Sequence, residues 1–182
     1  FAAVYECTYG TYIRMTFQKT FDAILATPVN IGDITAAELA WAAIKSVIYG
    51  VTIMIVVALF GVVDSPLLVL AIPVIFLCGL IFAEISMITT ALVPGIDSFS
   101  YFYTLFMTPL FLFSGIFFPL DSFPAALARV ATFTPLYHLV KVCRALTAGS
   151  LSDAAGSMAA IVILAAALSP FPFRLMRRKI IV

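Results

Sequence analysis

Apolar positions gather into four long runs along this chain. They cover residues 39–60, 66–93, 98–118 and 154–173. Each run is about as long as a helix must be to cross the hydrocarbon core of a bilayer, roughly 20 residues. Residues 1–9 are also apolar but too few to span, so we expect them to be the end of a further spanning helix. The pattern predicts an all-α polytopic membrane protein whose helices form a single bundle.

Residues 10–38 follow a different pattern, in which polar and apolar positions alternate at helical spacing. The apolar positions fall near one side of a helix: Met15, Phe17 or Phe21, Ile24 and Leu25. The polar positions fall elsewhere: Arg14, Gln18, Lys19 and Asp22. Pro28 ends this helix, and Asp33 or Thr35 is expected to cap the next. The segment is either an amphipathic helix lying on the membrane surface or a docking helix for a partner protein, and we favour docking.

Residues 114–144 are apolar but cannot form one spanning helix, because three prolines interrupt them: Pro119, Pro124 and Pro135. Two short helices are expected instead, the first capped by Asp121 or Ser122 and the second by Thr134. Non-helical backbone at membrane depth persists only where protein or a water-filled cavity surrounds it. Residues 119–147 are therefore interpreted as a re-entrant or interfacial helical hairpin that closes one end of the bundle.

This hairpin is the candidate outer gate. In its second helix, the polar side chains lie away from the apolar stripe, toward water or lipid headgroups. Gly115 allows the chain to leave the preceding span at a sharp angle. The gate hypothesis covers these residues: Ser114, Gly115, Phe118, Pro119, Asp121, Pro124, Pro135, His138, Lys141 and Arg144.

The composition supports membrane insertion. Hydrophobic residues make up 64% of the chain and charged residues 10%, against about 45–50% and 25% in soluble domains. A formal net charge of +1 argues against nucleic acid as a partner. Three cysteines without metal-ligand spacing are expected to be inert buried thiols.

The basic residues predict the orientation. If residues 10–38 and the tail 174–182 are cytoplasmic, seven basic residues lie on that side: Arg14, Lys19, Lys45, Arg174, Arg177, Arg178 and Lys179. Three lie on the other: Arg129, Lys141 and Arg144. This distribution obeys the positive-inside rule and places the hairpin outside. Lys45 falls within an apolar run, and we expect its long stem to carry its charge to the headgroup layer.

Two carboxylates lie within apolar segments, where a charge costs on the order of 3 kcal/mol. Glu6 is expected to form an ion pair with Arg14 or to contact another helix. Glu84 is interpreted either as a structural hydrogen-bond partner of a neighbouring helix, which we favour, or as part of a conduit. The run 98–118 is rich in aromatic residues, which either pack in the core or line a path for an amphiphilic or sugar-bearing substrate. The candidate path residues are Tyr101, Tyr103, Phe106 and Phe113.

No pattern for catalysis is present. His138 is the only histidine, so the chain holds no histidine-based metal cluster, and it carries neither a GxSxG elbow nor a phosphate-binding glycine loop. We predict no catalytic residue, metal site or cofactor in this chain. Any nucleotide chemistry must come from another subunit.

The chain resembles permeases of the ABC type-2 transporter family, nearest the nodulation-type branch that exports lipo-oligosaccharides and drugs. The resemblance rests most specifically on residues 114–146, SGIFFPLDSFPAALARVATFTPLYHLVKVCRAL, and on residues 18–29, QKTFDAILATPV. It implies a permease homodimer in the bacterial cytoplasmic membrane, with ATP and Mg²⁺ bound by separate ATPase subunits. It also implies that one segment is the coupling helix seated on the ATPase: Gln18, Lys19, Thr20, Phe21, Asp22, Ile24, Leu25, Ala26, Thr27, Pro28 and Val29.

The function implied by this resemblance is ATP-driven export of an amphiphilic substrate, namely a lipo-oligosaccharide, a glycolipid or polysaccharide, or a drug. The rival hypothesis is a membrane anchor or assembly protein that transports nothing. An ATPase that copurifies with the chain and responds to lipid-like substrates would separate the two.

Overall fold

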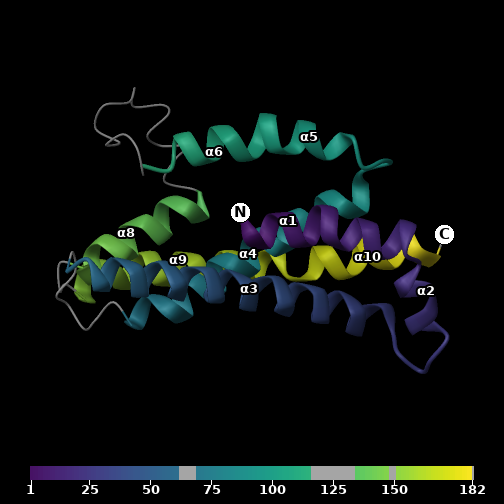
Figure 1. Cartoon of the computed structure of the whole chain (residues 1–182), viewed down its shortest axis with the longest axis horizontal. Helices are drawn as coiled ribbons and strands as arrows, with labels where there is room; N and C mark the ends of the chain where they lie inside the picture. The colour runs from purple at the N-terminus through teal and green to yellow at the C-terminus, as the bar shows by residue number, and fades with distance from the viewer. Residues whose placement is uncertain (62–68, 116–133, 148–150, 182) are drawn as a thin grey trace.

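Long helices lie roughly along one axis in the computed structural model of the chain (Figure 1). The structure describes residues 1–61, 69–115, 134–147 and 151–181. Every regular element in these ranges is helical, which confirms the predicted all-α fold. Three helical stretches are long and apolar enough to span a membrane: Ile31–Leu59, Ala71–Leu92 and Ala154–Ile180. The protein is therefore a multi-pass membrane protein.

Helix α4 (Ala71–Leu92) is the centre of the bundle. It contacts α1 (Ala2–Tyr5), α3 (Ile31–Leu59), α9 (Leu151–Leu168) and α10 (Pro170–Ile181). Its side chains are buried on several faces, whereas α3 leaves most of its apolar surface exposed. A helix that is apolar all round suits the interior of a membrane bundle.

Close contact between α3 and α4 depends on a glycine. A Cβ atom added at Gly79 would lie 2.7 Å from the Cβ of Ser46, which is too close for two carbon atoms. Small residues at such a crossing let two helix backbones approach, and in lipid this dispersion contact replaces the hydrophobic effect as the force that joins helices. Many apolar side chains of α3 are exposed: Trp41, Ile44, Ile48, Tyr49, Ile53, Ile55, Val56 and Leu59.

The first helix runs further than the predicted span 1–9. It continues from α1 through the π-helices η1 (Glu6–Gly10) and η2 (Ile13–Phe17), so helical backbone enters the predicted 10–38 segment. The chain then turns and forms α2 (Thr20–Leu25), and α3 begins at Ile31, before the predicted start of the span 39–60. The physical reason is a capping box: the Asn30 backbone N–H donates to the Asp33 carboxylate at 3.0 Å.

The predicted span 98–118 consists of three consecutive helical pieces. These are α5 (Ser98–Phe102), the π-helix η4 (Tyr103–Met107) and α6 (Thr108–Leu112). In Figure 1 they lie along one side of the bundle. Ring contacts attach them to the first helix, because Phe99 packs against both Tyr9 and Tyr12, with centroids 5.1 and 5.5 Å apart.

The last part of the chain is helical to its end in the described range. Helix α8 (Pro135–Thr147) packs on α9 and α4, and α9 leads through Ser169 into α10. The predicted boundary between the span 154–173 and the tail 174–182 does not appear as a break, since α10 extends through it and packs on α3 and α4. The predicted run 66–93 contains α4, and residues 66–68 of that run lie outside the described residues.

Candidate functional site

The candidate docking element, α2, lies at the end of the molecule where α3 begins and α10 ends (Figure 1). Lys19 precedes it with a φ of 50°, in the left-handed region, and this residue reverses the chain direction after η2. After α2, the hydroxyl of Thr27 donates to the carbonyl oxygen of Ile24 at 2.6 Å and satisfies the helix end. Two ordered turns thus hold α2 between the first helix and α3.

The residues predicted for coupling divide into an inward and an outward group. Phe21 is buried in a core cluster against which Met15 and Ile31 also pack, while Thr20, Ile24 and Leu25 are half-buried. The outward group is exposed: Gln18, Lys19, Asp22, Ala26, Thr27, Pro28 and Val29. Ala23, which the sequence prediction did not include, is exposed beside Asp22. The buried and half-buried side chains therefore attach α2 to the bundle, and the exposed residues, polar and apolar, are the ones available to a partner.

Four charged side chains join the two helices that lead into and out of α2. Arg14 lies 2.9 Å from a Glu6 carboxylate oxygen and 2.5 Å from Glu38 Oε2, and Lys45 Nζ lies 2.5 Å from Glu6 Oε2. We call these four residues the charge clasp. The predicted ion pair between Glu6 and Arg14 is present. Besides Glu6, Lys45 Nζ lies near the Trp41 ring, 5.7 Å from its centre. That its stem carries the charge to the headgroup layer stays a prediction.

Neighbouring residues fit the clasp closely. The Thr11 hydroxyl donates to Glu38 Oε2 at 2.8 Å, and a Cβ added at Gly10 would lie 3.3 Å from Glu6 Oε1. Arg14 lies beyond the predicted end of the first span. Burial acts to lower its pKa, but the hydrogen bonds and charges of Glu38 and Glu6 outweigh it, so the pKa is raised. Arg14 is consequently cationic at any physiological pH.

A second polar contact at this end attaches α10 to α4. Lys179 Nζ donates to the carbonyl oxygens of Thr90 and Val93, both at 2.7 Å, and lies 5.5 Å from the centre of the Tyr12 ring. A cation at a helix C-terminus offsets the partial negative charge of the free carbonyls there. The Tyr12 hydroxyl donates to Pro94 O at 3.3 Å, so the first helix takes part in the same contact.

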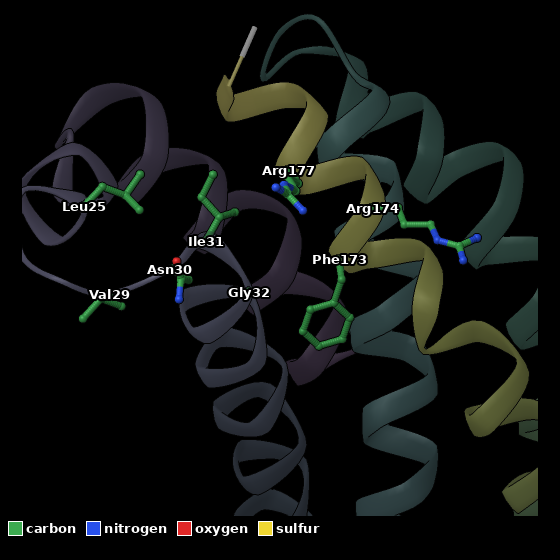
Figure 2. A pocket seen from close by; sticks show the side chains of 8 residues that line it. All are labelled: Leu25, Val29, Asn30, Ile31, Gly32, Phe173, Arg174 and Arg177. Atoms are coloured by element: carbon green, nitrogen blue, oxygen red, sulfur yellow. The ribbon is translucent and has the colours of Figure 1, made fainter.

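A cavity of about 520 Å³ opens between α10 and the start of α3. Figure 2 shows its lining residues at the end of α2, on the α2–α3 turn, on the first turn of α3 and on α10. The lining combines apolar side chains with two arginines: Leu25, Val29, Asn30, Ile31, Gly32, Phe173, Arg174 and Arg177. The sequence prediction included Leu25 and Val29 as coupling residues but did not connect them with α10.

The opposite end contains the described part of the candidate gate. Gly115 has a φ of 82°, and its carbonyl oxygen accepts a hydrogen bond of 2.8 Å from Arg144. Ser114 is buried and its hydroxyl donates to Phe111 O. Pro135 begins α8, as predicted, and Lys141 is exposed while His138 is half-buried. The other gate residues lie outside the described residues: Phe118, Pro119, Asp121 and Pro124.

The candidate path residues do not share one environment. Tyr101 and Phe106 are exposed, whereas the Tyr103 hydroxyl lies 3.2 Å from that of Thr8 on the first helix. Phe113 is half-buried near the end of α6. Glu84 is buried in α4, and within the described residues its Oε2 atom has no hydrogen-bond partner. The predicted hydrogen bond to a neighbouring helix is not among the contacts of this part of the chain.

A family model described as ABC-2 type transporter matches residues 1–147. The chain belongs to this family. Its ABC-2 region contains the charge clasp, α2 and the described gate residues up to the end of α8. Similar proteins are named nodulation protein J. That of Rhizobium meliloti (strain 1021) is 43% identical over 82% of this chain and 57% of its own length. That of Rhizobium leguminosarum bv. viciae is 41% identical over 79% of this chain and 55% of its own length.

The ABC-2 chain described here therefore spans about half the length of the curated relatives it matches. No solved structure matches it. Family membership confirms the resemblance that residues 18–29 and 114–146 indicated, and with the spanning helices it supports a multi-pass protein of the bacterial inner membrane.

Proposed function

We propose that this ABC-2 chain is part of the permease of an ATP-driven exporter and that α2 is the helix on which the ATPase subunit docks. One observation carries the proposal: α2 exposes Asp22 and Ala23, with exposed residues directly before and after it, while the charge clasp joins the helices on either side. A helix that fits a partner should expose a contact face and be attached firmly enough to transmit movement.

The clasp gives a physical route for coupling. Glu6 and Arg14 lie on the helix that leads into α2, and Glu38 and Lys45 lie on α3, which leads out. Because each cation contacts a carboxylate on the other helix, a push on α2 moves both helices together. The spanning helices then tilt as one unit. ATP and Mg²⁺ are proposed to bind the partner ATPase, whose closure supplies that push.

The cargo is proposed to be an amphiphile: a lipo-oligosaccharide, a glycolipid or polysaccharide, or a drug. Exposed aromatic side chains on α5 and η4, Tyr101 and Phe106, support this class, since aromatic faces accept both apolar chains and sugar rings. We propose that two permease copies enclose the path and that the hairpin beside Gly115 and Arg144 borders its exit.

A pair of matched substitutions tests the docking proposal in the full-length permease expressed with its ATPase. Thr27 and Thr147 are both exposed and both donate a hydroxyl hydrogen bond three residues back, at 2.6 and 2.8 Å. Thr27→Arg should reduce copurification of the ATPase and ATP-dependent export at least tenfold. Thr147→Arg, at the opposite end, should leave both within twofold.

Equal ATPase recovery and export in the two variants would reject α2 as the docking helix. An ATPase that copurifies with the wild-type protein but drives no movement of any amphiphile in sealed vesicles would favour the anchor hypothesis instead.

A further inference from the structure

The cavity between α10 and α3 contains cations that the fold does not use. At this end of the molecule Arg14 and Lys45 contact carboxylates, and Lys179 donates to two carbonyl groups. Arg174 and Arg177 are different. Among the residues that the structure describes, neither has an ion pair or a hydrogen bond through its guanidinium group, yet both line the cavity. Two cations at one cavity without an internal counter-charge predict an anionic ligand.

Positive charge reaches the cavity from α10 and from the start of α3. In Figure 2, Arg177 and Phe173 project from α10 toward Ile31 and Gly32, while Arg174 extends to the other side of α10 in this view. Ile31 and Gly32 belong to the first turn of α3, whose backbone N–H groups carry partial positive charge. This helix end adds to the arginine charge, although Asp33 on the same turn already accepts a hydrogen bond from the Asn30 backbone N–H.

The remaining walls are apolar. Leu25, Val29 and Phe173 line the cavity, and α3, whose first turn also lines it, carries exposed large apolar side chains from Trp41 onward. The cavity lies between the start of α3 and α10, which the predicted topology places on the cytoplasmic side. A soluble anion would use only the arginines, and an acidic peptide would leave the apolar face of α3 unused. A lipid contacts both the arginines and the apolar side chains of α3, with its headgroup at the arginines and its acyl chains along α3.

We propose that this cavity binds the headgroup of an anionic phospholipid from the cytoplasmic leaflet. Basic pockets between spanning helices on the cytoplasmic side are suited to such headgroups. The cavity volume of about 520 Å³ falls within the range of small-molecule sites. The proposal rests on the cytoplasmic placement of α2 in the proposed function but not on transport. A lipid held here contacts the α2–α3 turn directly, so lipid composition would influence how firmly α2 is held.

The test is the affinity of the full-length purified protein for phosphatidylglycerol and phosphatidylcholine, titrated in mixed micelles and read by native mass spectrometry. The wild type should prefer phosphatidylglycerol. Arg177→Gln should weaken phosphatidylglycerol binding about fivefold, and Arg174→Gln with Arg177→Gln roughly thirtyfold, as expected for basic side chains near an anionic surface. Arg178→Gln is the matched control on the same helix, because Arg178 is exposed but does not line the cavity. It should change the affinity less than twofold.

A second variant blocks the cavity and keeps every charge. A Cβ added at Gly32 meets no atom within 4 Å, so Gly32→Leu can extend into the cavity without a clash near the backbone. It should reduce phosphatidylglycerol binding at least fivefold, whereas the smaller Gly32→Ala should have little effect. Both replacements favour the helix over glycine, so neither should unfold the protein.

Four results would overturn the proposal. The first is equal affinity of the wild type for both lipids, and the second is a loss of affinity in Arg178→Gln as large as that in Arg177→Gln. The third is binding of glycerol phosphate, which has no acyl chains, as tight as that of phosphatidylglycerol. The fourth is a double arginine variant that keeps its lipid affinity but no longer copurifies with the ATPase. The last would assign the arginines to an acidic segment of the partner. Thr27→Arg distinguishes failure of the docking proposal, because it should lose the ATPase while it retains the lipid preference.

Discussion

Lys179 in α10 donates a hydrogen bond of 2.7 Å to the carbonyl oxygen of Thr90 in α4, across 89 positions of sequence. A second bond of 2.7 Å runs to Val93 O. These hydrogen bonds join the C-terminal helix to α4 at the end where α2 lies. Together with the buried Met176 side chain, they explain why residues after 173, predicted as a tail, form an ordered helix on the bundle.

Replacing Lys179 with methionine should therefore loosen α10. Methionine keeps an apolar stem of similar length but leaves both carbonyl groups without a donor. Buried carbonyls that lose their partner cost about 1–3 kcal/mol, so we expect a lower unfolding temperature in detergent. Lys179→Arg, which keeps a cationic donor, should retain most of the wild-type unfolding temperature. Arg178→Met is the control. If Lys179→Met and Arg178→Met both unfold at the wild-type temperature, the Lys179 hydrogen bonds contribute nothing to stability.

The charge clasp gives a second prediction about stability. Arg14→Met leaves Glu38 and Glu6 with one fewer cation in a half-buried site, and removing one partner of a buried pair costs about 3–5 kcal/mol. Arg14→Met combined with Glu38→Met removes both opposite charges, so the double variant should be more stable than Arg14→Met alone. Denaturation of all three variants, analysed as a double-mutant cycle, measures the coupling. Additive losses would mean that the two residues act independently.

The spanning helices could be predicted from the sequence because hydropathy is a property of each segment alone. The clasp could be predicted only in part. Glu6 and Arg14 lie eight positions apart on one helix, and their pairing was predicted because both lie toward the cytoplasmic end of it. Lys45 pairs with Glu6 only because α3 packs beside the first helix. Lys179 could not be paired from the sequence either, because its acceptors are backbone atoms of another helix.

Local patterns do not decide between two roles that share one periodicity. The amphipathic spacing that predicted a docking helix is equally the spacing of a helix attached by its apolar face. Phe21 is buried against the bundle, so it attaches α2 and does not face a partner. The continuation of the first helix to Phe17 rests on π-helical turns, whose wider spacing the 3.6-residue period does not describe.

Glu84 is a buried carboxylate of α4 whose role can be tested by substitution. Within the described residues its Oε2 atom has no partner, and burying a carboxyl group without a hydrogen bond is costly. An amide is uncharged at every pH, so Glu84→Gln should unfold at the same temperature or a higher one. We expect it to retain export when tested with the ATPase in vesicles. Lost export from a stable, well-expressed Glu84→Gln variant would show instead that the carboxyl group must exchange a proton or carry charge.

Gly115 and Arg144 lead to the last prediction, at the proposed outer gate. Gly115 has a φ of 82°, which a β-branched side chain adopts only with strain, and its carbonyl oxygen accepts a hydrogen bond of 2.8 Å from Arg144. Gly115→Val should rotate this carbonyl away and detach α8 from the end of α6. We expect export to fall at least tenfold, while the ATPase still copurifies because α2 lies at the opposite end.

Arg144→Gln is the companion variant, since it removes the same hydrogen bond without straining the backbone. It should reduce export less than Gly115→Val and leave the unfolding temperature within a few degrees of the wild type. Thermal stability measured beside export separates a gate from a structural cap: a cap would lose both together, and a gate would lose export first. A stable Gly115→Val protein with wild-type export would show that the path opens elsewhere.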